Sequence, residues 1–312
     1  MDRFAIYKKA GKLGLKPVSY SQFSMFHNCP LNWYRTYVEK IKFDKPSIEM
    51  LFGSAFHTVL QEYLTVYFNE GTIKADLLDL NRMLNENMKL EFKNSMKEGM
   101  TPFTDKDQMV EFYIDGTSIL EFIKENKREY FDRIKYELVE MEYALVVPSD
   151  INPKVGIVGF LDIVLRERGT DKYFVRDIKT SFRGWQDNKK KDFSTKSQVL
   201  VYKKCLAKDL GVPVENIEVD FFIVKRKLWE SEFKQKPVQI FEPSSGKVSM
   251  KKFEEEFNKF IGIFDENGKV KDGVIFNKAA DKKKCTYCNF KGTEYCTRST
   301  KPITHGNSNN SG

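Results

Sequence analysis

The order of apolar and polar residues divides the chain into a helical first part and a mixed second part. Residues 47–68 (SIEMLFGSAFHTVLQEYLTVYF) are strongly apolar with helical spacing, and residues 78–92 and 109–130 place charged residues between apolar ones at the same spacing. A shorter helix is expected after the hydroxyl-rich stretch that precedes Phe23, with Ser21 as its N-cap. The first 135 residues are therefore predicted to be mainly α-helical.

After Arg133 the pattern changes to short β-rich runs. The expected strands lie at 137–148, 155–168, 172–181, 217–227 and 237–242. A helix over 197–211 is predicted to end at Gly211, and a last helix covers 248–264. Three strands, a helix and a further strand in this order predict an α/β core inside a helical surround.

The composition is that of a folded protein. Hydrophobic residues make up 41% and aromatic residues 14% of the 312 residues, which is enough to fill a core. No run of 18 apolar residues occurs, so a membrane-spanning helix is excluded. The first twenty residues scatter Lys and Gly through the region where a secretion signal would be apolar. We therefore expect a cytoplasmic protein with no membrane partner.

The net charge of +8, from 52 Lys and Arg against 44 Asp and Glu, favours a polyanionic partner such as nucleic acid. Phosphate groups that are neutralised by Lys and Arg release their counterions, which adds free energy to binding. The alternative is an ordinary surface of mixed charge, and the charge alone does not decide between the two.

Acidic residues in otherwise apolar strands are the first chemical signal. Asp162 lies between Leu161 and Ile163, and Asp177 and Lys179 end the next strand. Side chains alternate along a strand, so Asp177 and Lys179 share one face, and Asp162 reaches the same place if the two strands pair as a hairpin. Two carboxylates beside a lysine suit Mg²⁺, with phosphodiester hydrolysis as the matching chemistry. The alternative is a salt bridge at the end of a strand, worth at most about 1 kcal/mol.

A histidine and a polar pair strengthen the metal-site interpretation. His57 lies on a helix too apolar to be an exposed one, where a neutral imidazole can add a nitrogen ligand. Gln198 and Tyr202 are one helical turn apart, so both project from one face. His57 alone could be a core histidine whose nitrogens are hydrogen-bonded, and the spacing of Gln198 and Tyr202 could arise by chance. The presence of all three beside the acidic residues is uncommon.

Together these motifs resemble the PD-(D/E)XK nuclease superfamily, and more closely its RecB-type branch, which includes AddB-like nuclease domains and CRISPR-associated exonucleases. The resemblance implies a restriction-endonuclease-like α/β fold, with a mixed central sheet flanked by helices, and a Mg²⁺ or Mn²⁺ cofactor. It implies that the metal ligands are His57, Asp162, Asp177 and the carbonyl of Ile178. It also implies that Lys179 is the catalytic lysine and that Gln198 and Tyr202 form the motif of the following helix.

In this family a glutamate often occurs in the strand ahead of the first aspartate. Glu140 and Glu142 both fit that position, and the choice between them stays open. The second acid is Asp177 rather than the more usual glutamate, a variation that the superfamily permits.

Five cysteines point to metal ligation or burial rather than to a disulfide framework. Cys285 and Cys288 form a C-x₂-C pair, Cys296 follows, and Cys29 stands far upstream. Four thiolates suit a four-iron four-sulfur cluster or Zn²⁺ equally well. The arrangement resembles the iron–sulfur form of the RecB-type nucleases, with one cysteine before the core and three after it. The alternative is unrelated buried thiols, and Cys205 is interpreted as an ordinary core cysteine.

Basic and aromatic residues follow the strand that carries Lys179. The expected DNA-binding residues are Arg183, Trp185, Lys189, Lys190 and Lys191. The basic side chains can hold phosphates while Trp185 or Phe182 stacks on an unpaired base. Lys196 and the cluster at 225–227 are further candidates, and each cluster has a solvated surface as its alternative.

The sequence thus predicts a metal-dependent DNA nuclease. Exonuclease action on DNA ends or single strands is preferred by resemblance, in recombination, repair or phage DNA metabolism, with a helicase or recombination protein as a partner. The alternatives are an endonuclease and a non-catalytic, metal-stapled DNA-binding module. The expected segments are an N-terminal arm at 1–45, a helical region at 46–135, the nuclease core at 136–283, the cysteine segment at 284–298 and a disordered tail at 299–312.

Overall fold

The structure, a computed structural model, describes residues 5–41, 46–96, 102–229, 235–286, 288–297 and 299–306. The helices are α1 (Ala5–Lys12), α2 (Tyr20–Asn28), α3 (Pro30–Tyr37), α4 (Ile48–Asn69), α5 (Thr72–Asp76), α6 (Leu80–Ser95), α7 (Lys106–Glu125), α8 (Lys127–Tyr130), α9 (Asp187–Lys191), α10 (Phe193–Leu210) and α11 (Lys247–Ile261). The strands are β1 (Lys16–Ser19), β2 (Tyr136–Pro148), β3 (Val155–Glu167), β4 (Tyr173–Ser181), β5 (Ile217–Lys225), β6 (Val238–Phe241), β7 (Ile275–Phe276) and β8 (Ile303–Thr304). The predicted helical first part and β-rich second part are both confirmed.

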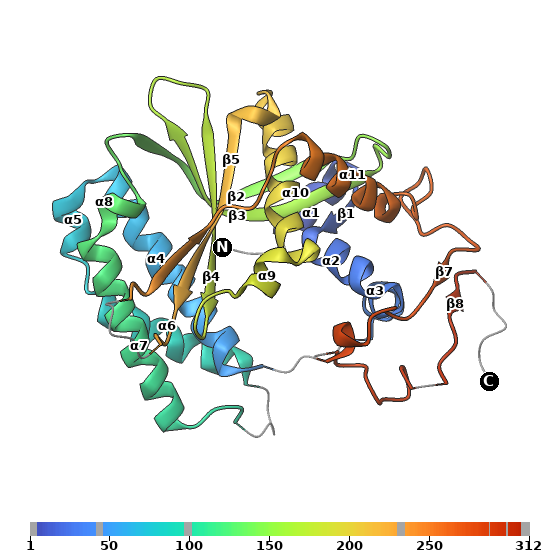
Figure 1. Cartoon of the computed structure of the whole chain (residues 1–312), viewed down its shortest axis with the longest axis horizontal. Helices are drawn as coiled ribbons and strands as arrows, with labels where there is room; N and C mark the ends of the chain where they lie inside the picture. The colour runs from blue at the N-terminus through green and yellow to red at the C-terminus, as the bar shows by residue number, and fades with distance from the viewer. Residues whose placement is uncertain are drawn as a thin grey trace.

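Strands β1 to β6 form one mixed sheet built around the long strand β3 (Figure 1). β2 pairs antiparallel with β3 along nearly its whole length, so β1 and β4 share the opposite edge. On that edge β1 runs parallel to residues 155–158, and β4 runs antiparallel to residues 163–166. β5 lies parallel to β4, reached through α10, and β6 is antiparallel to β5. The predicted mixed sheet with flanking helices is therefore confirmed.

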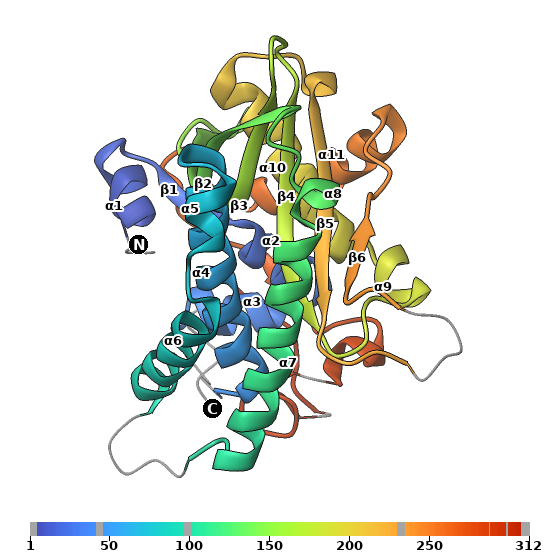
Figure 2. The same cartoon turned by 90° about the vertical axis from the view of Figure 1, so that its left-hand side faces the viewer.

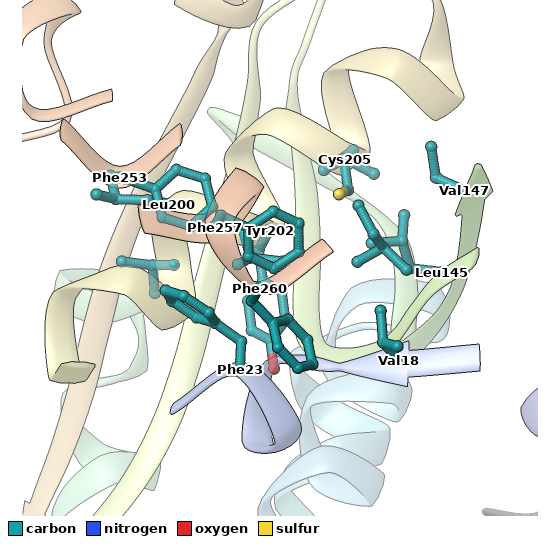
Figure 3. Close-up of a cluster of buried hydrophobic side chains, with 14 of the residues drawn as sticks. Val18, Phe23, Leu145, Val147, Leu200, Tyr202, Cys205, Phe253, Phe257 and Phe260 are labelled. Atoms are coloured by element: carbon teal, nitrogen blue, oxygen red, sulfur yellow. The ribbon is translucent and has the colours of Figure 1, made fainter. Parts of the chain in front are cut away.

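Helices cover both faces of the sheet, with α4, α6 and α7 on one side and α2, α10 and α11 on the other (Figures 1 and 2). Side chains alternate along each strand, so Phe221 packs with the α10 side and Phe222 with the α4 side. Figure 3 shows the core on the α10 side, with Tyr202 of α10 and Phe257 of α11 among its members. The same alternation places Asp177 on the α10 face of β4.

Local capping chemistry sets several helix ends. Ser47 caps α4 and Asp192 caps α10, each by accepting a hydrogen bond from the backbone N–H three residues on. α10 ends at Gly211 as predicted, where a φ of 69° favours glycine. The N-cap of α2 is Ser19 and not Ser21, because Ser19 has the extended backbone of a cap whereas Ser21 already lies in the first turn. Within the described ranges, no helix combines the length and apolar character needed to cross a bilayer.

The C-terminal segment packs against the first helices. Phe276 of β7 stacks on Trp33 of α3, with ring centroids 5.8 Å apart. β8 pairs antiparallel with β7, so the chain is folded at 303–304, inside the tail that was expected to be disordered. The apolar side chain of Ile303 packs on the core of the α10 side, which explains this difference. The rest of that tail, from residue 307 onward, lies outside the described residues.

A buried ion pair joins β4 to β5. Arg176 Nη2 lies 2.6 Å from Asp220 Oδ2, and the two residues are 7% and 0% exposed. The rings of Phe131, Phe174 and Phe222 surround the guanidinium group at 5.2, 5.1 and 5.5 Å. Arg176 and Asp220 are also register partners in the parallel ladder, so the pair links the two central strands directly.

Candidate active site

Two acidic residues face each other where strands β3 and β4 part. The antiparallel ladder pairs Ile163 with Arg176 and stops there. Continued by one residue, this register sets Asp162 opposite Asp177, and residues directly opposite in an antiparallel pair share a face. The hairpin on which the sequence argument depends is therefore present, and it brings Asp162 next to Asp177 at the point where the two strands part.

Where β3 and β4 part, the side chain of Asp162 accepts a hydrogen bond from the backbone of β4. Its Oδ2 accepts from the backbone N–H of Ile178 at 2.7 Å. The N–H and C=O of one strand residue point to the same edge, so the Ile178 carbonyl also faces the gap beside Asp162. His57 Nδ1 on α4 lies 3.8 Å from Asp162 Oδ2, and Gln61 Nε2, one turn further along α4, donates to the Asp162 carbonyl at 3.3 Å. Helix α4 thus positions the first acid.

Asp177 is the more deeply buried acid, with 1% exposure. Its Oδ2 lies 2.6 Å from Lys179 Nζ, two residues along the same strand face. Its Oδ1 accepts from Gln198 Nε2 at 2.8 Å, and the same amide nitrogen donates to Tyr202 OH at 3.1 Å. Gln198 and Tyr202 therefore project from one face of α10, and that face meets the Asp177 carboxylate.

Burial and neighbouring charges set the protonation of the site. Burial raises the pKa of Asp177 to about 6, with help from the charge of Asp162 and against the opposing effect of the Lys179 ammonium. Burial lowers the pKa of Lys179, but Asp177 and Asp162 raise it by more, so its net direction is upward. Lys179 is therefore an ammonium group at neutral pH, and its side chain is still 31% exposed.

The donor atoms here suit a hard divalent cation. Asp177 Oδ2 is buried and, among the described residues, receives no hydrogen bond of good geometry, although the Lys179 ammonium lies beside it. A cation between two carboxylates would also relieve the repulsion that raises the Asp177 pKa. Across the described ranges, no group of three or more His, Cys, Asp or Glu side chains is placed to hold a metal ion. His57, Asp162 and Asp177 are thus neighbours rather than a closed set of ligands.

The structure distinguishes the two candidate glutamates on β2. The register that pairs Met141 with Ile163 sets Glu142 opposite Asp162. Glu140 is exposed and pairs two residues further along β3. Glu142 also has a φ of 51°, a left-handed value that is uncommon for a non-glycine residue and recurs near functional sites. Of the two glutamates, Glu142 is therefore the one that lies opposite Asp162.

The four cysteines of the expected cluster come from both ends of the chain and line one cavity of about 1260 Å³: Cys29, Cys285, Cys288 and Cys296. Burial raises the pKa of Cys29, and Cys288 and Cys296 raise it further, so these thiols lie within electrostatic range of one another. Asn32 Nδ2 donates to Cys288 Sγ at 3.6 Å. The four thiols do not form a closed ligand set among the described residues. Cys205 is a core residue on α10, with 2% exposure.

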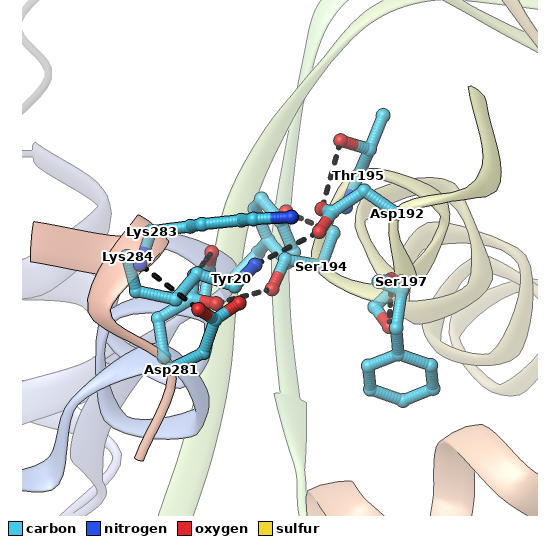
Figure 4. A network of polar contacts seen from close by, with 11 residues as sticks. Tyr20, Asp192, Ser194, Thr195, Ser197, Asp281, Lys283 and Lys284 are labelled. Carbon is cyan, nitrogen blue, oxygen red and sulfur yellow. Dashed lines mark hydrogen bonds and ion pairs between the residues drawn. The ribbon is translucent and has the colours of Figure 1, made fainter. Parts of the chain in front are cut away.

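The sequence argument missed the basic rim of this cavity and its link to α10. The rim lysines are Lys278, Lys282, Lys283, Lys284 and Lys291. Lys284 Nζ lies 2.9 Å from Asp192 Oδ1, and Tyr20 OH donates to the Ser194 carbonyl nearby (Figure 4). The run of three lysines before Cys285 was a usable signal for the rim. Gln61 was also missed, and its signal was a polar residue four positions after His57 on an apolar helix.

The structure separates the expected DNA-binding residues. Lys189, Lys190 and Lys191 belong to the short helix α9, on the surface. Trp185 packs against Phe221, with ring centroids 4.8 Å apart, at the edge of the core on the α10 side. Phe182 is 54% exposed, and the Arg183 guanidinium lies 5.1 Å from its ring. Trp185 is partly buried and packs on the core, whereas Phe182 is the more exposed of the two rings, and contact of either ring with a base stays a prediction.

Comparison with known proteins identifies the family. The model of the PD-(D/E)XK nuclease superfamily matches residues 17–295, which is most of the chain. The chain belongs to this superfamily. Among solved structures, a protein from Eubacterium rectale that is described provisionally as an exonuclease resembles the chain with a TM-score of 0.50 and 11% sequence identity, over 95% of this chain and 94% of that one. This likeness shows a shared fold. No curated protein matches the chain.

The last letters of the PD-(D/E)XK name agree with the residue order at the end of β4, where Asp177 is followed by Ile178 and Lys179. Asp162 lies on the neighbouring strand β3. The superfamily match spans all of these positions. The motif and the meeting point of the two strands therefore coincide.

Proposed function

We propose that the chain is a Mg²⁺- or Mn²⁺-dependent deoxyribonuclease that hydrolyses phosphodiester bonds. The observation that carries this proposal is the meeting of Asp162, Asp177 and Lys179 where β3 and β4 part, beside His57. Two carboxylates and an imidazole suit the metal, and an ammonium group suits the negative charge that develops on a phosphate. Membership of the PD-(D/E)XK superfamily supports the same conclusion.

Each residue of the site has a distinct role in this proposal. The metal-holding groups are His57, Asp162, Asp177 and the carbonyl of Ile178. When bound, the ion polarises the phosphate and lowers the pKa of a water molecule. Lys179 donates hydrogen bonds that orient this water or stabilise the phosphate charge, because it stays protonated at neutral pH. Gln198 and Tyr202 fix the Asp177 carboxylate, and Glu142 corresponds to the family glutamate.

Exonuclease action of the RecB-like type on DNA ends or single strands is the proposed mode. The order of His57, Asp162, Asp177, Lys179 and Gln198 along the chain supports this branch. Arg183 and the lysines of α9 follow the catalytic strand and supply cations for the phosphate backbone. Recombination, repair or phage DNA metabolism is the corresponding setting, with a helicase or recombination protein as a partner.

We further propose that the four clustered cysteines, Cys29, Cys285, Cys288 and Cys296, bind a four-iron four-sulfur cluster, with Zn²⁺ as the alternative. Their shared cavity supports a common ligand. A brown protein with broad absorbance near ~400 nm would support the iron–sulfur cluster. A colourless protein with stoichiometric zinc would instead support Zn²⁺ as the ligand of the four cysteines. A protein that contains neither metal would contradict both assignments.

Digestion of end-labelled DNA tests the proposed activity. The purified chain is incubated with linear single-stranded, linear double-stranded and closed circular DNA in Mg²⁺ or Mn²⁺. Lys179→Ala is expected to lower the cleavage rate about 10²–10³-fold, because it removes a charge that is needed in the transition state. Lys172→Ala, in the exposed turn before β4, is the matched control and is expected to cleave at the normal rate.

The substrates separate the possible modes of action. Digestion of linear but not circular DNA would support an exonuclease, and discrete fragments from closed circles would identify an endonuclease. DNA binding without metal-dependent cleavage on any substrate would overturn the proposal in favour of a binding module.

A further inference from the structure

Two aromatic rings face solvent beyond the ends of the central strands. Phe182 follows the last residue of β4 and is 54% exposed, and Trp229 lies four residues after β5 and is 52% exposed. They are the two most exposed aromatic side chains of the described residues. Burial of these rings against a ligand would be favourable, because it removes apolar surface from water.

Arginine side chains lie over both rings. The Arg183 guanidinium is 4.1 Å from the centroid of the Trp229 ring and 5.1 Å from that of Phe182. The Arg226 guanidinium lies 5.1 Å from the centroid of the Phe182 ring. It forms an ion pair with Asp115, in which Nη1 lies 2.6 Å from Oδ2. Arg183 differs from Arg226, because its buried Nε has no hydrogen-bond partner in the part of the chain that is described. A cation beside open rings is therefore held at this surface.

The backbone around these rings is fixed by hydrogen bonds. Arg226 N donates to the Ser181 carbonyl at 2.9 Å, and Lys227 N donates to the Phe182 carbonyl at 2.7 Å. Gly184 has a φ of 85°, and a Cβ there would lie 2.9 Å from Gln239 Oε1, so the turn needs glycine. A surface that is already ordered loses little conformational entropy when a ligand binds.

We propose that Phe182, Arg183 and Trp229 form a stacking platform that holds unpaired bases of the DNA strand whose phosphate lies at Lys179. Phe182 is three residues beyond Lys179 on an extended strand, which is about 10 Å. Aromatic rings bind bases of any sequence by stacking, and a nearby arginine adds charge for the backbone. Bases inside a duplex stack on one another instead. The platform rests on the proposed nuclease function and adds to it the residues that would hold the unpaired bases of the substrate.

Binding without metal tests the platform separately from cleavage. In EDTA, a fifteen-residue oligothymidylate is compared with an abasic oligonucleotide of the same length and phosphate number, and with a blunt duplex. Trp229→Ala is expected to weaken oligothymidylate binding about ten- to hundredfold and to leave abasic binding within about twofold, because stacking requires a base. Phe182→Ala is expected to do the same. Trp229→Phe retains a ring and should keep most of the affinity, and Leu228→Ala is the exposed apolar control.

Tryptophan fluorescence gives a second readout. Trp33 is 2% exposed and Trp185 packs on Phe221, so quenching by oligothymidylate should come mainly from Trp229 and disappear in Trp229→Ala. Equal losses on the abasic and normal strands, or no loss on either, would overturn the platform. Base-dependent binding through Trp229 by a protein that does not cleave DNA would support the platform while contradicting the proposed enzymatic function.

Discussion

Asp177 shows how the fold keeps an acidic group where its charge is unfavourable. The carboxylate is 1% exposed and lies beside the like charge of Asp162, and its pKa rises to about 6. Lys179 and Gln198 contact its two oxygens, but they do not cancel the effect of burial. A perturbed acid held in this way points to chemistry rather than to stability.

This perturbed pKa predicts a pH-dependent effect of Asp177→Asn on stability. The folded-state pKa lies above the unfolded-state value of about 3.9, so the folded protein binds the extra proton and loses stability as the pH rises from about 4 to 6. Asparagine resembles the neutral acid at every pH. Measured in EDTA, the melting temperature of the variant minus that of the wild type should therefore increase over this range and then level off.

Asp171→Asn is the control for this titration, because Asp171 is 70% exposed in its ion pair with Arg166. Its effect on the melting temperature should be small throughout the range. A constant difference between Asp177→Asn and the wild type from pH 4 to pH 7 would contradict the assigned direction of the shift.

Residue spacing was sufficient to predict the core of the site but not its surroundings. Alternation along a strand is a local property, so the shared face of Asp177 and Lys179 follows directly from the sequence. The contact of Trp185 with Phe221 was not predictable in the same way, because the two residues belong to different elements that are distant in sequence. Tyr202 was predictable in part. The spacing placed it on the same helix face as Gln198, but it did not show that this face meets the Asp177 carboxylate.

At the scale of elements, the alignment of β4 with β5 depends on the buried pair of Arg176 and Asp220. We predict that Asp220→Ala lowers the free energy of unfolding by about 3–5 kcal/mol, because it leaves the Arg176 charge buried without a carboxylate. Urea denaturation measures this change. Arg176→Met combined with Asp220→Leu should recover much of the loss, since replacement of both charges by apolar groups is often neutral.

The exposed pair of Arg166 and Asp171 supplies a matched comparison. Asp171→Ala should cost at most about 1 kcal/mol, because solvent screens this pair. If Asp220→Ala cost no more than Asp171→Ala, the buried pair would not be what aligns the two strands.

Element order was predictable from the sequence, and element register was only partly so. Periodicity identified the strands and helices of the core, and the short turn between β3 and β4 favoured their hairpin. The irregular pairing of β2 near Leu138 and Glu140 left no clear sequence signal, and it decides that Glu142 stands opposite Asp162. Side-chain alternation alone could not choose between Glu140 and Glu142, because they are two residues apart and so share a face.

At the scale of the whole molecule, the proposed cysteine cluster would link the first helices to the C-terminal segment. We predict that Cys285→Ala lowers the melting temperature by at least roughly 5 °C, because a ligand that binds only the folded chain stabilises it. Cleavage per folded molecule should change much less, since Asp177 and Lys179 lie outside the cysteine cavity. Calorimetry and the digestion assay measure the two effects.

Lys301→Ala, an exposed substitution near the end of the described chain, is the control for this comparison. Unchanged thermal unfolding of Cys285→Ala would contradict a stabilising role for the cysteines. If Cys285→Ala lost cleavage only in proportion to the loss of folded protein, the result would agree with the prediction. If the variant were fully stable but did not cleave DNA, the result would contradict it.

The stacking of Trp33 on Phe276 also bears on how the protein is made. These residues are separated by about 240 positions, which a ribosome takes roughly ten to fifty seconds to translate. During that time α3 lacks one of its aromatic packing partners. The contact between Trp33 and Phe276 can therefore form only after β3 and β4, which carry Asp162, Asp177 and Lys179, have been translated. Folding on the ribosome would in this order place the central strands before the aromatic packing around α3 is complete.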